Sequence, residues 1–278
     1  MTTPAYTLTN LTPTIGAEVR GVDLAKLDDA MGEWLKASLA ERQVLVFRDQ
    51  QIDHLQHKAV GRLFGTGTLH IHHLIRGKTA DDEITPVLTN ADSAYNIGDG
   101  WHADVTCDPD PIAASLLYMR IMPEGGGGDT MFANMHECWQ RLSDPIKALL
   151  EPLTARHDGA FAYGVGYGLG ADTQRAYNCS DHPVVIDHPV TGKKTLFVNA
   201  AFTTQINGLS APESRAILDM LFRHIDLTVT SHVRIKWEKD TLVMWDNVAT
   251  QHQAVWDYFP ETRLAERVSV IGKRIDGA

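Results

Sequence analysis

Apolar positions in the first part of the chain follow two patterns, and each pattern predicts a different kind of element. Helical spacing of apolar residues predicts an amphipathic helix over residues 28–42, because side chains three or four positions apart share one face of a helix. The short, continuous apolar run VLVFRD at 44–49 is typical of a buried strand. A second helix is expected over residues 53–64, and two short strands joined by a turn at Gly16 are expected within residues 5–24.

The middle of the chain is less regular. Residues 66–112 contain many His, Asp, Gly and Pro residues, which predicts loops with short strands between them. A strand is expected at 113–121, and a single helix is expected at 134–151. The segment 158–180 contains AFAYGVGYGLG, which is too rich in glycine for a stable helix, and we interpret it as a loop or lid over the active site.

The last third predicts further strands, because short apolar or alternating runs are bounded by turn residues. These runs are KKTLFVNAAF, HVRIKWEKDTLVMWDN and RLAERVSVIGKRI. One helix interrupts them at about 211–225, and Ser210 and Glu213 have the spacing of a capping box at its start. Closely spaced strands with a few helices on one side favour a mainly β fold with flanking helices, a β-sandwich or jelly roll.

Composition bears on partners and compartment more than on the fold. The chain has 278 residues, no repeat and no low-complexity linker, so residues 1–278 are expected to form one domain. A net charge of −10 disfavours nucleic acid and anionic membranes as partners. The N-terminal residues lack the pattern of a signal peptide, and no apolar run has the length of a membrane span. The three cysteines form no C-x-x-C pair and suit a reducing compartment, so a cytoplasmic protein is expected.

The sequence Trp101-His102-Ala103-Asp104 indicates a metal site. Residues two apart on an extended segment point to the same side, so the His102 imidazole and the Asp104 carboxylate can reach one cation. His252 follows far downstream, just after a predicted strand. Two His and one carboxylate that leave open positions are the ligand set of non-haem iron(II) oxygenases. Taken alone, the His102 and Asp104 pair is more typical of a hydrogen-bonded pair without metal.

Longer strings spread over most of the chain resemble the TauD/TfdA-like family, the taurine dioxygenase-like iron(II)/2-oxoglutarate oxygenases. They are AEVRGVDL, VLVFRDQ, FGTGTLHIH, WHADVT, GGDT, HPVVIDHPVTGKKTLFVNAAFTT and WDNVATQH followed by DYFPETRLAERVSVIG. The resemblance implies a double-stranded β-helix (jelly roll, cupin-like) fold, with Fe(II) as the metal and 2-oxoglutarate and O2 as cosubstrates. It also implies that His102, Asp104 and His252 are the iron ligands and catalytic residues.

The resemblance further assigns the 2-oxoglutarate site to Arg263 and Thr130. A guanidinium can bind both oxygens of a carboxylate, and a hydroxyl can add a third hydrogen bond. Read without the resemblance, Arg263 would be a surface residue paired with Glu261 or Glu266, and Thr130 would be a turn residue after flexible glycines.

The substrate side of the resemblance is less complete. Arg267, His70 and Phe202 match the positions that hold the sulfonate and form an aromatic wall in taurine enzymes, and His73 also falls in this pocket. His73 stands where those enzymes have Tyr, and Gly98 where they have Asn, which argues against taurine itself. Tyr163 and Tyr167 either line a larger, more aromatic pocket or face solvent.

The predicted function is hydroxylation of a small anionic substrate (a sulfonate, sulfate ester or carboxylate) with release of succinate and CO2. The alternatives are the same chemistry on a larger aromatic or natural-product-like substrate, a zinc hydrolase with the same three ligands, and a non-catalytic module that binds 2-oxoglutarate or another small acid. An assembly of identical subunits is also expected.

Overall fold

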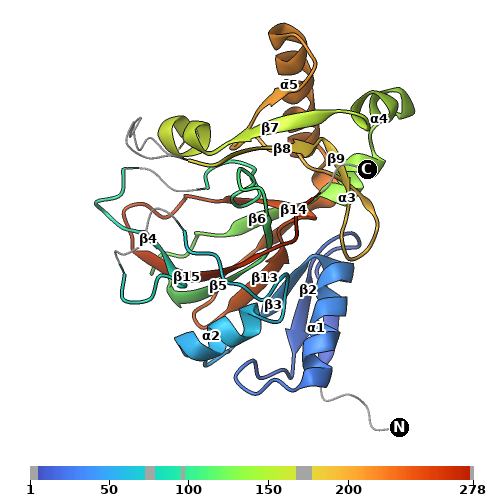
Figure 1. Ribbon diagram of the computed structural model, residues 1–278. Coiled ribbons are helices and arrows are strands. Elements are labelled where there is room, and N and C mark those ends of the chain that lie inside the picture. Colours follow the sequence, from blue (N-terminus) through green and yellow to red (C-terminus); the bar gives the residue numbers. More distant parts are fainter. Residues whose placement is uncertain (1–5, 73–78, 95–97, 167–176, 276–278) are drawn as a thin grey trace.

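The computed structural model describes residues 6–72, 79–94, 98–166 and 177–275, and its centre is a seven-stranded sheet (Figure 1). Its strands lie in the order β1-β2-β3-β13-β5-β15-β4, with β2 and β3 parallel and the other neighbours antiparallel. The bounds are β1 Thr7–Asn10, β2 Ala17–Arg20, β3 Val44–Phe47, β4 Thr85–Thr89, β5 Ile112–Ile121, β13 Leu242–Asp246 and β15 Arg263–Ile271.

A second sheet packs against the inner face of the first. It contains β12 (His232–Ile235), β6 (Thr130–Asn134) and β14 (Thr250–Ala254), in that order. One apolar cluster joins the two sheets, with Val46 from β3 and Phe132 from β6 among its members. Two sheets packed face to face confirm the expected jelly roll.

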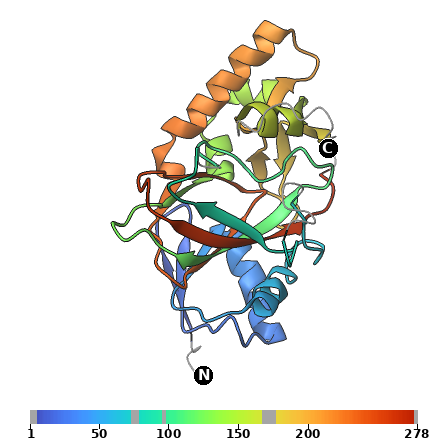
Figure 2. The same cartoon turned by 90° about the vertical axis from the view of Figure 1, so that its left-hand side faces the viewer.

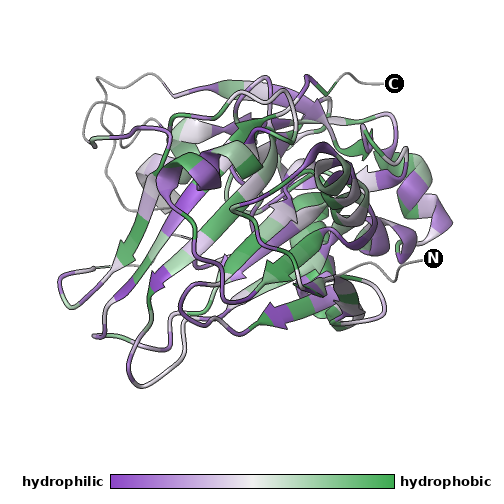
Figure 3. Cartoon of the chain, turned by 90° about the horizontal axis from the view of Figure 1, so that it is seen from below, coloured by the Kyte–Doolittle hydropathy of each residue, from purple (hydrophilic) through white to green (hydrophobic). Residues whose placement is uncertain are grey.

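The outer face of the large sheet is covered by two helices, as predicted. Strand side chains alternate, so Leu45 and Phe47 point away from the inner cluster and pack with α1 (Asp29–Arg42) and α2 (His54–Gly61). Burial on both faces explains the continuous apolar run of β3, and green apolar residues run along the strands of this sheet in Figure 3. The Asp28 carboxylate caps α1 by accepting a hydrogen bond from the backbone N–H of Met31.

A smaller layer lies beyond the second sheet and includes the long helix α5 (Ala211–Leu227), which projects from the molecule in Figures 1 and 2. Glu213 accepts hydrogen bonds from the backbone N–H and the hydroxyl of Ser210, at the predicted start of this helix. The remaining elements are α3 Met135–Gln140, α4 Asp144–Leu150, β7 Thr154–Asp158, β8 Cys179–Pro183, β9 Val185–Asp187, β10 Lys194–Leu196, β11 Thr203–Ile206 and a 3-10 turn at Val229–Ser231. Among the described helices, none combines the length and apolar character needed to cross a membrane.

Three predictions about elements were wrong in detail. The helix expected at 134–151 is broken into α3 and α4, because Pro145 lies in the first turn of α4, lacks an N–H and disfavours helical backbone before it. The segment 158–180, which was predicted to be a loop or lid without a helix, contains a π-helix at Phe161–Gly166. The strand expected from KKTLFVNAAF is only the short β10, and chain reversal at Asn199 separates it from β11.

Two buried histidines make the stability of this fold depend on pH. Burial, together with the neighbouring His182, lowers the pKa of His157 to about 3. Burial lowers the pKa of His57 to about 4, although its Nε2 lies 3.2 Å from the carbonyl of Leu116. Both rings are neutral in the folded protein but have ordinary pKa values near 6.5 in the unfolded chain. Their neutral state therefore contributes fully to the free energy of unfolding above about pH 6.5, and this contribution is lost as the pH falls.

We expect each of these histidines to reduce the free energy of unfolding by about 2 kcal/mol between pH 6.5 and pH 5. Urea unfolding of the wild type and of His57→Gln at both pH values measures the effect. The glutamine keeps an N–H donor for Leu116 but cannot take up a proton, so the variant should lose less stability at pH 5. His54→Gln, at an exposed position on the same helix, is the control. Equal pH dependence in His57→Gln and wild type would contradict the assignment.

Candidate active site

Two segments that are far apart in sequence pair at the centre of the candidate site. His102 and His252 form an isolated antiparallel bridge, in which each backbone N–H donates to the carbonyl of the other at 3.0 and 2.8 Å. Their ring centroids are 4.1 Å apart. His252 lies within β14, which was not predicted as a strand because its sequence TQHQA is polar. Backbone pairing with β6, and not an apolar pattern, therefore places this histidine.

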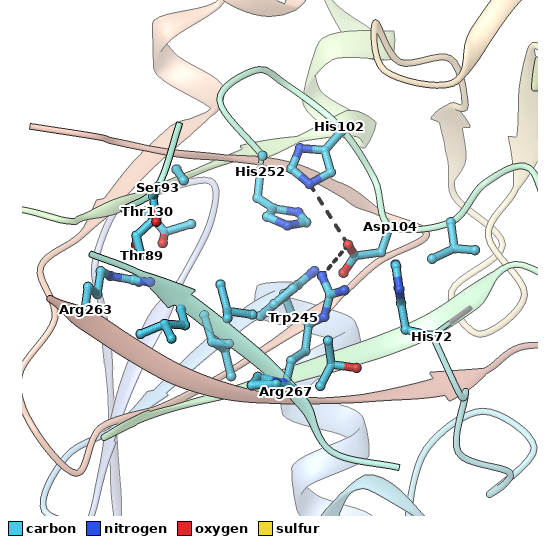
Figure 4. Close-up of a pocket in the computed structure, with 18 of the residues that line it drawn as sticks. His72, Thr89, Ser93, His102, Asp104, Thr130, Trp245, His252, Arg263 and Arg267 are labelled. Atoms are coloured by element: carbon cyan, nitrogen blue, oxygen red, sulfur yellow. Dashed lines mark hydrogen bonds and ion pairs between the residues drawn. The ribbon is translucent and has the colours of Figure 1, made fainter. Parts of the chain in front are cut away.

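The Asp104 carboxylate converges on the two rings. Ligand atoms of His102, Asp104 and His252 all lie within 4.8 Å of one another, and the residues are 5%, 5% and 7% exposed. Figure 4 shows the two imidazoles and the carboxylate turned toward one point of the pocket. Within the described parts of the chain, no other set of three His, Cys, Asp or Glu side chains is arranged in this way.

The protonation states of these groups suit a divalent metal ion. Burial lowers the pKa of His102 and, more strongly, that of His252, so both rings are neutral. The Nδ1 of His102 lies 2.8 Å from the carbonyl of Gly100, and donation to that oxygen leaves the Nε2 lone pair available. Burial opposes ionisation of Asp104, but the Arg267 guanidinium beside it holds the pKa of the carboxyl below its ordinary value. Two neutral imidazoles and one carboxylate are the expected donors for iron(II).

Two residues that sequence reasoning missed hold Asp104 in place. The Asn247 side chain accepts from the Asp104 backbone N–H at 2.8 Å and donates to its carbonyl at 3.0 Å. The Ser115 hydroxyl donates to Asp104 Oδ2 at 3.0 Å and lies 3.0 Å from the hydroxyl of its cross-strand partner Ser269. A serine inside the apolar run AASLL was the available signal for Ser115, and the string WDN was the signal for Asn247.

Gly98 stands where taurine enzymes have Asn, and the structure gives a reason for glycine. Its φ of +89° lies in the left-handed region, and a Cβ there would approach His102 Cε1 at 3.0 Å. The Gly98 carbonyl also accepts from the backbone N–H of Ala254, two residues after His252. This position therefore supports the ligands through its backbone.

A second cluster, formed by Arg263 and Thr130, lies on the side of the pocket away from His72 (Figure 4). Arg263 is 5% exposed, and burial lowers its pKa. Its Nε donates to the carbonyl of Gly128 at 3.1 Å, and its guanidinium lies over the Trp237 ring at 5.6 Å. Thr130 accepts a hydrogen bond from Trp237 Nε1 at 2.9 Å.

No carboxylate of the described residues forms an ion pair with Arg263. Glu266 pairs instead with Arg120 at 2.7 Å and His54 at 3.0 Å, and Glu261 accepts from the backbone N–H of Gly125. The alternative of a surface ion pair for Arg263 was therefore wrong. A buried guanidinium that opens onto a pocket without a carboxylate partner favours an anionic ligand.

One cavity of about 570 Å³ connects the metal-ligand cluster, the Arg263 cluster and Arg267. Arg263 and Arg267 lie four residues apart on β15 and both face this cavity, as the strand prediction required. Phe202 also lines it, as does Tyr163, whose ring lies 5.8 Å from the Phe202 ring at 77°. Tyr163 is buried, so the reading of this tyrosine as a solvent-facing residue was wrong.

The histidines on the substrate side are arranged differently from the sequence prediction. His70 does not line the described part of the cavity, and its Nε2 lies 3.5 Å from Asp108 Oδ2. His72, which lies in the segment 66–112 predicted to be mostly loop and was not named as a site residue, lines the cavity and lies edge-on to Tyr163 at 5.8 Å. Residues two apart on a regular strand would share one face, so the irregular backbone of residues 70–72 accounts for the different directions of the two side chains. His73, Tyr167 and residues 167–176 of the expected lid lie outside the described residues.

Comparisons with known proteins agree with this geometry. Residues 7–269 match the family described as "Taurine catabolism dioxygenase TauD, TfdA family". An alpha-ketoglutarate-dependent (2-oxoglutarate-dependent) sulfonate dioxygenase of Saccharomyces cerevisiae is 32% identical over 282 residues, which cover 95% of this chain and 66%, about two thirds, of the yeast protein. An alpha-ketoglutarate-dependent sulfate ester dioxygenase of Pseudomonas putida is 32% identical over 276 residues, 93% of this chain and 87% of that protein. The solved structure of AAD-2 in complex with Mn(II) and N-oxalylglycine is 26% identical, has a TM-score of 0.85, and matches over 98% of this chain and 99% of that one.

Proposed function

Because the chain belongs to the TauD/TfdA family of dioxygenases, we propose that it hydroxylates a small anionic substrate with Fe(II), 2-oxoglutarate and O2. When bound, iron(II) with 2-oxoglutarate and O2 supplies the oxidant for a C–H bond and releases succinate and CO2. His102, Asp104 and His252 would hold the iron. The observation that carries the proposal is the convergence of these three buried side chains within 4.8 Å. They lie at the wall of a cavity that also contains the buried Arg263, which has no ion-pair partner among the described residues.

The residues of the chain divide the work of binding. Arg263 and Thr130 would bind the far carboxylate of 2-oxoglutarate, since this guanidinium has no carboxylate of its own among the described residues. Arg267 would hold the anionic end of the substrate, so that one carbon faces the iron. Phe132, Trp245 and Phe202 contribute apolar lining that keeps water away from the reacting atoms.

The substrate class rests on two kinds of support. The relatives are named for sulfonate, sulfate ester, alkylsulfate and phenoxypropionate substrates, which share an anionic group on an organic body. The cavity offers a guanidinium close to the metal ligands within a mostly apolar lining. Hydroxylation of a carbon that bears a sulfonate, sulfate or aryloxy group would give an unstable product. This product would collapse to a carbonyl compound and release the anion. Tyr163 and Phe202 form a wall that favours the second candidate, an aromatic substrate of the same chemistry.

The test is a panel assay. Iron-loaded protein with 2-oxoglutarate is incubated with alkyl and aryl sulfonates, sulfate esters, aryloxy acids and small amino acids, and succinate and O2 uptake are measured. Substrate-dependent succinate is the expected result. Turnover of a hydrolysable ester with zinc and without 2-oxoglutarate would point to the hydrolase alternative. Binding of 2-oxoglutarate without O2 uptake across the panel would favour the non-catalytic module.

The proposed compartment is the cytoplasm, where the three free thiols would stay reduced. The assembly of identical subunits stays a prediction.

A pair of glycines tests the 2-oxoglutarate side of the cavity. Gly126 and Gly128 both have positive φ, +84° and +72°, so alanine at either costs about 1 kcal/mol of backbone strain. A Cβ at Gly128 would lie 2.8 Å from Arg263 Cδ, whereas one at Gly126 would meet nothing within 4 Å. We therefore expect Gly128→Ala to raise the KM for 2-oxoglutarate roughly tenfold, the equivalent of about 1.4 kcal/mol, while Gly126→Ala leaves it nearly unchanged. Similar KM values in the two variants would show that Arg263 is not displaced.

A further inference from the structure

Arg267 contacts the metal-binding cluster itself. Its Nη1 lies 2.6 Å from Asp104 Oδ1, and Figure 4 shows the guanidinium directed at this carboxylate. The other carboxylate oxygen, Oδ2, accepts the hydrogen bond from Ser115. Oδ1 is also the oxygen that lies 4.0 Å from His102 Nε2, so it faces the other ligands. Arg267 therefore binds the same carboxylate oxygen of Asp104 that faces the proposed metal position.

Arg267 and Asp104 form a close ion pair, but the pair uses only one nitrogen of the guanidinium. Asp104 is its only ion-pair partner among the residues described, and one guanidinium nitrogen makes the contact. Its Nε is buried and has no hydrogen-bond partner within the parts of the chain that the structure describes. A side chain with a single anionic partner and unused donors is held by charge and can exchange that partner for another anion.

We propose that Arg267 is the internal counter-ion of Asp104 while the metal site is empty, and that metal binding releases it to bind the anionic group of the substrate. The inference rests on the proposed metal site. A divalent cation at Asp104 Oδ1 neutralises the carboxylate and repels the guanidinium a few ångströms away. The guanidinium then faces the cavity without a counter-charge, which is the state that an anionic substrate requires.

Two consequences follow from this exchange. Metal and anionic substrate should bind cooperatively, because each disfavours the Arg267–Asp104 pair, and the coupling must be the same in both directions. In the metal-free protein Asp104 occupies Arg267, so an anionic compound should bind more weakly there than in the metal-bound protein. Typical couplings between sites change affinity by about 5- to 150-fold.

The first experiment measures metal affinity without any turnover. Mn(II) is titrated into metal-free wild type, Arg267→Gln and Arg263→Gln by calorimetry, in the absence of 2-oxoglutarate. Arg267→Gln should bind Mn(II) about tenfold more tightly than wild type, since the competing cation is gone. Arg263→Gln removes a positive charge from the same strand and the same cavity without touching Asp104, and should change the affinity less than about threefold. Equal or weaker Mn(II) binding by Arg267→Gln would overturn the inference.

The second experiment uses the wild type, so that it does not depend on how a variant folds. Phenylglyoxal modifies accessible guanidinium groups, and peptide mass spectrometry gives the rate at each arginine. Mn(II) should speed modification of Arg267 several-fold and leave Arg263 unchanged, and an unchanged rate at Arg267 would also overturn the inference. If wild type binds no Mn(II) at all, the proposed metal site itself fails, which separates the two hypotheses.

Discussion

Replacing His252 with alanine is expected to lower substrate-dependent succinate formation by more than about a hundredfold. Loss of an outer-shell partner alone typically costs 10–100-fold in metal affinity or activity, and His252 would be a direct ligand. The imidazole has no substitute nearby, because the described residues contain no other metal-binding side chain in this cluster. The same result is expected for His102→Ala and Asp104→Ala. Succinate is measured at saturating 2-oxoglutarate, with iron added over a wide concentration range.

The control for His252→Ala is Gln253→Ala, on the next position of the same strand. Gln253 is half-buried and points its amide at Met131, away from the cluster. Both variants keep the β14 backbone, so circular dichroism and thermal unfolding should resemble those of wild type in each. Full activity of His252→Ala at ordinary iron concentrations would remove this residue from the ligand set. Comparable loss in Gln253→Ala would show that β14 is simply intolerant of substitution.

Two of the three metal ligands could be paired from the sequence because they are local, whereas the family resemblance added the distant His252. His102 and Asp104 are two residues apart on an extended segment, and alternation alone puts them on one side. Arg263 and Arg267 share a face of β15 for the same reason. The large-sheet strands and helices α1 and α5 were also predictable, because their apolar spacing reports burial on one face or both.

Features that depend on long-range contacts could not be predicted in this way. Strand β14 is polar because His252 lines the cavity and the buried Thr250 and Gln251 donate hydrogen bonds to backbone carbonyls, so apolar periodicity could not reveal it. His72 lines the cavity in place of the predicted His70 because the backbone between them is irregular. His70 instead lies next to Asp108, which comes from another loop. The contact between Arg267 and Asp104 joins residues 163 positions apart. By contrast, the break between α3 and α4 was foreseeable from Pro145.

Arg263→Gln is expected to raise the KM for 2-oxoglutarate about a hundredfold and to leave the KM for the organic substrate nearly unchanged. Removing one member of a buried charge pair costs about 2–5 kcal/mol, and each 1.4 kcal/mol is tenfold in affinity. Glutamine retains an amide donor but not the charge, so the far carboxylate of 2-oxoglutarate would enter a buried site without a counter-ion. Succinate formation against 2-oxoglutarate concentration measures the change.

Arg267→Gln provides the matched comparison, because it removes the same group four residues further along β15. Its effect should fall on the KM of the anionic substrate, with a much smaller effect on 2-oxoglutarate. Arg263→Lys should recover only part of the 2-oxoglutarate affinity, since an ammonium keeps the charge but lacks the planar fork that binds both carboxylate oxygens. Equal changes in both KM values for the two glutamine variants would contradict a division of labour between the arginines. Full recovery in Arg263→Lys would mean that charge alone, without the guanidinium geometry, holds the cosubstrate.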